Sequence, residues 1–361
     1  MIQQIILPYI SLNKIPSFLF NIKKEIIQYN LTDYYIKNVQ DNKIKNLLKE
    51  NNNHIINTLI NIFRSKFGYQ YIDDYYLEYL EFLNIQYPDI NENNNIKIIC
   101  YNDNNYLSIN KSVYDIFHFK NISKLEIDKI VVKINSKNDI LNILKYPRKK
   151  TNIAILDLNY ELCDELNELL LTLPLILYDL QKNGDLIISL KDTYGTLVIE
   201  ILYFLNIIFK KVFISRPLIM NIHKRHRYII CKNLLPNEVD KTLITHLFEY
   251  AYQHILLKKD LNKNCKLMDC NLPIFFKQKI NDINCIFGQQ ILENTMLFVN
   301  KKHNDLNLYY QNNYSLVLDW LELHKIYLPI NKEDFITNNE VSGLMNKIFN
   351  YLEENKVTEE S

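Results

Sequence analysis

The chain has 361 residues, of which 48% are hydrophobic, and a formal net charge of +1 at pH 7. These values exclude a disordered chain and favour a folded protein of two or three structural units. The longest apolar run, Thr196 to Phe209, is too short for a membrane span and contains Glu200 and Asn206. The first residues lack the pattern of a signal peptide, and six cysteines at irregular spacing do not form a secreted disulfide framework. We therefore expect a cytoplasmic protein.

The composition also indicates what kind of genome encodes the chain. Asparagine, isoleucine, lysine and tyrosine are abundant, whereas alanine occurs only at Ala154 and Ala251. This bias is expected of a coding sequence rich in A and T, as in large cytoplasmic DNA viruses, which adds a viral factory or a virion as possible locations. Against that background arginine is informative, and four of the five arginines fall between residues 148 and 227. Arginine suits planar contact with phosphate, although scattered surface charge is the simpler explanation.

The pattern of apolar residues divides the chain into three regions. Residues 1–90 are predicted to be a mostly helical N-terminal region, because apolar residues recur there near helical spacing. Residues 236–361 are predicted to form a helical C-terminal region with a long helix from Phe275 to about His303.

Residues 91–235 alternate short β-branched runs with amphipathic stretches, which predicts an α/β domain whose mostly parallel sheet is covered on both faces. The expected strands are 96–101, 129–134, 152–158, 185–190, 211–214 and 227–231, and the expected helices are 136–146, 161–182 and 194–209. No helical pattern separates the last two strands, so an antiparallel edge strand is expected there.

Residues 152–231 resemble the second half of an FtsJ-like S-adenosylmethionine (SAM) methyltransferase domain, the family that includes viral mRNA cap 2'-O-methyltransferases. The order of segments carries the likeness: NIAILDL, a long helix ending in QKNG, DLIISL, a second helix, KVFISRP and RYIICKN. A weaker likeness covers a later helix that contains Trp320. The resemblance implies a Rossmann-like fold in which Asp157 is the catalytic aspartate and Gly184 lies in the turn that opens its strand.

The family's chemistry uses a Lys-Asp-Lys-Glu set, because a weakly acidic ribose hydroxyl must lose a proton while it is held in line with the methyl donor. The pattern for the second lysine falls on Ser189, and Lys191 follows two residues later on the same face of the strand. His226 stands where the family has the glutamate. Lys66 is the nearest match to the first lysine.

The cofactor loop of the family is also missing. A SAM-binding sheet normally has a glycine-rich turn after its first strand, so that the backbone can approach the ligand. Here the strand at 96–101 runs into NDNNY, and no glycine occurs between Gly68 and Gly184. The region before Asp157 is about one strand–helix unit short. No cofactor is therefore expected, with SAM as the ligand if the chain is active.

These departures favour a degenerate, non-catalytic relative that binds RNA or a partner protein in mRNA capping or RNA processing. The small subunit of the poxvirus capping enzyme has a similar outline. The alternative is an active SAM-dependent RNA 2'-O-methyltransferase that uses Asp157 and Lys191. A virion or translation-related binding protein that reuses the fold is a third class.

Two basic loops are candidates for contact with RNA phosphates. The candidate residues, which we expect to lie near the carboxyl edge of the sheet, are Lys149, Lys150, Arg216, Lys224, Arg225 and Arg227. Solvated loops or a protein interface are the alternatives.

A metal site is not expected. Zinc would need Cys265, Cys270 and Cys285 with His254 or His303, and their spacing resembles a metal site only loosely.

Overall fold

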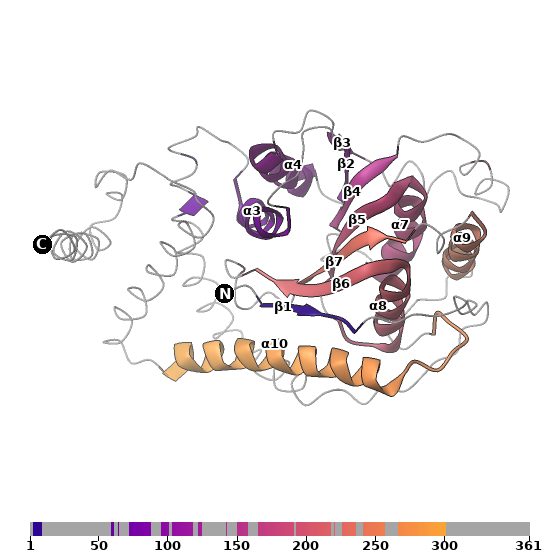
Figure 1. Ribbon diagram of the computed structural model, residues 1–361. Helices are drawn as coiled ribbons and strands as arrows, with labels where there is room; N and C mark the ends of the chain where they lie inside the picture. The colour runs from indigo at the N-terminus through magenta and orange to yellow at the C-terminus, as the bar shows by residue number, and fades with distance from the viewer. Residues whose placement is uncertain are drawn as a thin grey trace, which may run out of the picture.

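In the computed structural model, one mixed β-sheet lies at the centre of the α/β fold, with helices on both faces (Figure 1). The residues that it describes are 3–8, 59–60, 64, 72–87, 95–100, 103–117, 122–124, 142, 150–157, 165–190, 193–217, 220, 226–235, 241–256 and 266–300. Within these residues, no helix is long and apolar enough to cross a membrane.

Within the described residues, seven strands form the sheet in the order β1-β6-β7-β5-β4-β2-β3. Their bounds are β1 Gln3–Ile6, β2 Ile96–Cys100, β3 Ile122–Lys124, β4 Thr151–Asp157, β5 Leu180–Leu190, β6 Phe209–Arg216 and β7 Arg227–Leu234. The helices described are α3 Asp74–Gln86, α4 Asp103–Phe117, α7 Glu165–Asp179, α8 Thr196–Ile208, α9 Lys241–Leu256 and α10 Ile274–Asn300. The predicted strand at 129–134 lies outside the described residues, as does the predicted helix at 136–146 except Asn142.

The pairing of the strands corrects two predictions. β3, β2, β4 and β5 are parallel, whereas β7 is antiparallel to both β5 and β6, and β1 is antiparallel to β6. The sheet is therefore evenly mixed rather than mostly parallel. The reversed strand β7 is real, but it lies inside the sheet rather than at its edge.

The N-terminal region was predicted to be mostly helical, and most of its residues lie outside the described part of the chain. Residues Gln3–Ile6 form an edge strand because they hydrogen-bond to the otherwise open side of β6, far away in sequence. The helical prediction is confirmed for α3 and for the start of α10.

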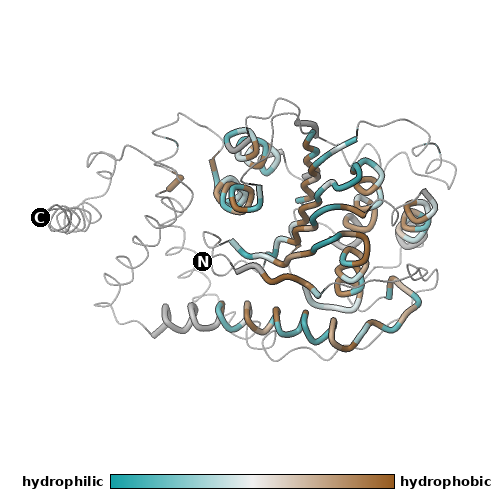
Figure 2. The backbone as a smooth tube through the Cα atoms, viewed as in Figure 1, coloured by the Kyte–Doolittle hydropathy of each residue, from teal (hydrophilic) through white to brown (hydrophobic). Residues whose placement is uncertain are grey.

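Two apolar cores lie on opposite faces of the sheet. α3 and α4 cover one face through residues such as Phe82 and Ile109, which pack with Ile155 of β4 and Ile187 of β5. The other core joins the opposite face to α7, α8, α9 and α10. Figure 2 shows hydrophobic residues concentrated in the central strands, whereas they alternate with hydrophilic residues along α10. We call the two sides of the sheet the α3–α4 face and the α7–α8 face.

Helix α8 is buried on nearly all sides because the sheet covers one side and α10 packs on another, and most of its residues are apolar. Its buried Glu200 accepts hydrogen bonds from the backbone N–H groups of Leu267 and Met268, the latter at 2.9 Å. Asn284 of α10 contacts Thr193 just before α8. These contacts fix the segment at 266–291 to the sheet domain.

The strand that contains Gly184 begins earlier than predicted. Gly184 does not open it, because β5 starts at Leu180 and contains a bulge between the pairs Thr151–Leu180 and Ile153–Asp185. A Cβ atom at Gly184 would lie 2.9 Å from the carbonyl oxygen of Gln181, so glycine is needed for this close approach of backbone.

Candidate functional site

A row of polar side chains crosses the sheet near the carboxyl ends of β4 and β5. Asp157 of β4 pairs in register with Ser189 of β5, Ser189 with Tyr228 of β7, and Tyr228 with Ser215 of β6. Residues paired in this way point to the same face of a sheet, here the α3–α4 face that also holds Ile155 and Ile187. We call Asp157, Ser189, Tyr228 and Ser215 the polar row.

The polar row is closed to solvent. Asp157, Ser189 and Tyr228 are each 1% exposed, and Ser215 is fully buried. The predicted position of the second lysine, Ser189, therefore lies directly beside the predicted catalytic aspartate. It presents a short hydroxyl in a buried environment rather than an ammonium group near a substrate.

Helix α3 covers the row and forms its main polar contact. The Tyr228 hydroxyl donates a 2.6 Å hydrogen bond to Oε2 of Glu78, which is also buried. The rings of Tyr79 and Phe82 pack against that of Tyr228, with centroids 5.4 and 4.8 Å away. Burial, followed by the charges of Glu78, Tyr79 and Asp157, raises the pKa of Tyr228 well above its usual value. Tyr228 therefore stays protonated as a hydrogen-bond donor at neutral pH.

A second contact fixes the other end of α3. The ammonium group of Lys232 donates to the carbonyl oxygen of Gln86 at 3.2 Å and lies 3.2 Å from the centre of the Tyr87 ring. From Glu78 to Gln86 the helix rises about 12 Å, and from Tyr228 to Lys232 the strand advances about 13 Å. The two distances match, so α3 lies along β7 and is held near both of its ends.

Arg216 and Arg227, two of the predicted RNA-binding residues, are buried at the same end of the sheet. Arg216 is 8% exposed and Arg227 is 2% exposed. Burial and then the charge of Arg227 lower the pKa of Arg216 to about 10, while Glu78 opposes the shift. The guanidinium of Arg227 lies 4.6 Å from the centre of the Phe287 ring of α10 and donates to the His226 carbonyl oxygen at 3.2 Å. In this arrangement the charge of Arg216 interacts with the buried Glu78, and neither arginine faces solvent.

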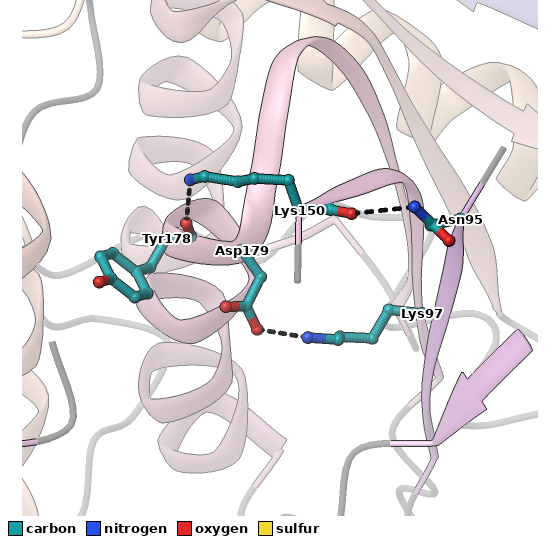
Figure 3. Close-up of polar contacts among 5 residues, drawn as sticks. All are labelled: Asn95, Lys97, Lys150, Tyr178 and Asp179. Carbon is teal, nitrogen blue, oxygen red and sulfur yellow. Dashed lines mark hydrogen bonds and ion pairs between the residues drawn. The ribbon is translucent and has the colours of Figure 1, made fainter. Parts of the chain in front are cut away.

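Lys150, another predicted RNA-binding residue, lies at the opposite edge of the sheet. It precedes β4, whereas Arg216 ends β6, and β4 alone spans about 20 Å. Its ammonium group donates to the carbonyl oxygen of Tyr178 at 2.7 Å, at the end of α7 (Figure 3). The prediction that both basic loops meet near the carboxyl edge is therefore wrong for Lys150, because the residue before a strand lies at its amino end.

Other predicted site residues lie outside the described part of the chain, namely Lys66, Lys149, Lys191, Lys224, Arg225, Cys265, His303 and Trp320. His226, at the predicted glutamate position, is half-buried just before β7. Within the residues that the structure describes, no group of three or more histidine, cysteine or acidic side chains is arranged to hold a metal.

The residues at the end of β2 do not fit SAM, the cofactor of the family that the sequence resembles. Only Tyr101 and Asn102 separate β2 from α4, and neither is a glycine. A SAM-binding sheet needs a glycine turn at this point, where the backbone approaches the ligand. The next strand across, β4, ends there in the buried Asp157.

Sequence reasoning missed two groups of residues. In the sequence, Glu78 is one of several polar residues on a predicted helix. Its contact with Tyr228 could not be foreseen, because the two residues lie 150 positions apart. Lys97 and Asp179 form a buried ion pair with a 2.5 Å contact at the amino edge of the sheet (Figure 3). A charged residue within the apolar run IKIIC was the available signal for that pair.

In comparisons with known proteins, the chain matches no protein-family model and no curated protein sequence.

Proposed function

We propose that the chain is a non-catalytic, methyltransferase-like subunit that binds RNA, a partner protein in mRNA capping or RNA processing, or both. The observation that carries the non-catalytic part is the pairing of Ser189 with Asp157 inside the closed polar row. A positioned group that accepts a proton contributes about 10²–10⁴-fold to such a reaction, and a buried serine supplies no equivalent. The RNA-processing part rests on the resemblance of residues 152–231.

Two features of the sheet support a Rossmann-like origin. The strands β3, β2, β4, β5 and β6 follow one another across the sheet in the doubly wound order 2-1-3-4-5, with β7 inserted between the last two. The helix after β2 lies on the α3–α4 face, whereas those after β4 and β5 lie on the other. The order reverses between β2 and β4, so Asp157 ends a strand where such sheets bind ligands.

The active enzyme remains the alternative. It would use Asp157 with Lys191, which follows the last residue of β5. A lysine at that position is displaced by about 6–7 Å from the expected one, because two residues separate Lys191 from Ser189. Catalytic groups need placement within about 0.5 Å, so this displacement favours the non-catalytic reading.

Methyl transfer from radiolabelled SAM to capped RNA tests the proposal. The full chain is assayed alongside Asp157→Ala and Lys191→Ala. We expect no transfer above background in any of the three proteins. Transfer by the unmodified chain that is lost in either variant would establish the enzyme and overturn the proposal.

A further inference from the structure

The amino edge of the sheet carries a row of lysines, of which Lys232 is partly buried and the other four are exposed. Lys150 precedes β4, Lys182 lies in the bulge of β5, Lys210 and Lys211 follow the first residue of β6, and Lys232 lies near the end of the reversed strand β7. We call these five residues the amino-edge lysine row. Since β4, β5, β7 and β6 are neighbours in that order, the row extends across about 14 Å.

Part of this positive charge is already neutralised. Lys232 pairs with Asp185 at 3.0 Å, and nearby Lys97 pairs with Asp179. Lys182, Lys210 and Lys211 are exposed, and none of their ammonium groups has an acidic partner within the described part of the chain.

The register adds to this excess of charge. Lys211 stands directly opposite Lys232 in the sheet. Asp185 beside Lys232 offsets part of the repulsion between the two ammonium groups, and Lys211 is left with the uncompensated charge. A polyanion bound at this position would be attracted to that charge.

An aromatic ring and two asparagines accompany the row. Tyr178 is partly exposed at the end of α7, and the ammonium group of Lys150 lies 5.4 Å from the centre of its ring. Asn183 and Asn233 are both exposed at this edge, with left-handed φ angles of 60° and 59°. Proteins that bind single-stranded nucleic acid combine cations along the backbone with aromatic rings on which bases stack.

We propose that the amino-edge lysine row binds the phosphate backbone of single-stranded RNA. The choice of RNA as the polyanion rests on the proposed function. The contact is electrostatic and independent of base sequence, because lysine acts as a point charge rather than as a planar fork. It lies at the edge of the sheet opposite the polar row, so it does not require the row to open.

Fluorescence anisotropy with a labelled 20-nucleotide single-stranded RNA tests this site at several salt concentrations. The decisive variant is Lys210→Gln/Lys211→Gln, and the matched control is Lys277→Gln/Lys279→Gln on α10, which removes the same charge. We expect about tenfold weaker binding for the first variant at low salt. The slope of log K against log salt should become less negative by about 1.4, at about 0.7 for each lost phosphate contact. The control should retain the unmodified affinity and slope.

Other outcomes would overturn the proposal. RNA binding that is insensitive to Lys210→Gln/Lys211→Gln, or equally sensitive to the control, would exclude the row as the site. Absence of RNA binding, with poly-glutamate bound in a manner that needs Lys210 and Lys211, would assign the row to an acidic protein. Methyl transfer that depends on Asp157 would refute the proposed function but leave the RNA result intact, so the two failures are distinguishable.

Discussion

Tyr228 links the sheet to the helix that covers it. Its hydroxyl donates to the buried carboxylate of Glu78, and its ring packs against two aromatic rings of α3. A buried acid is costly unless hydrogen bonds and opposite charges compensate it. The hydroxyl of Tyr228 and the nearby charge of Arg216 provide that compensation, so they contribute to the stability of the fold.

Removing this hydroxyl tests the structural role of the polar row. We expect Tyr228→Phe to lower the free energy of unfolding by about 1–3 kcal/mol, because Glu78 loses a buried donor. Tyr114→Phe is the matched control, since Tyr114 is 50% exposed and its substitution should change stability by less than about 0.5 kcal/mol. Urea unfolding followed by circular dichroism measures both. Equal stability of the two variants would show that the Tyr228–Glu78 contact contributes little.

At the scale of elements, the carboxyl end of α7 depends on two lysines. The last residue of α7, Asp179, is an acid at the negative end of a helix dipole, which is unfavourable by itself. Lys97 of β2 compensates it through the buried ion pair, and Lys150 binds the carbonyl oxygen of Tyr178 in the preceding position. These contacts attach α7 to β2 and to the start of β4.

Two variants distinguish the stability lost when Asp179 is left buried without a partner from the stability lost when the whole ion pair is removed. Lys97→Met should lower the free energy of unfolding by about 3–5 kcal/mol, because Asp179 is left as an uncompensated buried charge. The double variant Lys97→Met/Asp179→Leu should recover most of this loss. Lys111→Met, in the partly exposed i,i+4 pair with Asp115, should cost less than about 1 kcal/mol. A double variant no more stable than Lys97→Met would contradict this account of α7.

The sequence predicted elements whose signal is local. A short window of sequence is enough to predict the strands β4, β6 and β7 from their apolar runs, and the helices α8 and α10 from their helical spacing. β1 could not be identified in this way, because its four residues form a strand only by pairing with β6. The helix α4 was missed because it begins within the asparagine-rich stretch NDNNY, which is typical of a turn.

The candidate site was predictable only in part. Alignment with the family pattern identified Asp157 and Ser189 as separate candidate positions, and the structure pairs them in register on adjacent strands. The burial of Arg216 and Arg227 could not be predicted, because it depends on α3 and α10 covering the ends of the strands. The position of Lys150 at the other edge followed from the direction of β4, which the prediction of one combined basic surface overlooked.

For the whole molecule, the two edges of the sheet differ in chemistry. The carboxyl edge, where a doubly wound sheet binds its ligand, holds buried carboxylates and hydroxyls beneath α3 and two buried arginines, of which Arg227 packs against α10. The amino edge carries exposed lysines. This distribution supports our proposal of a methyltransferase-like protein without the reaction, which binds its partners elsewhere on its surface.

Calorimetric titration of SAM into the full chain tests this claim most directly, with S-adenosylhomocysteine as a second ligand and Asp157→Ala as the control variant. We predict no saturable heat of binding for either ligand up to about 1 mM, a concentration at which a site with a micromolar Kd would be filled. Saturable one-to-one binding of SAM to the unmodified chain, weakened in Asp157→Ala, would contradict the account.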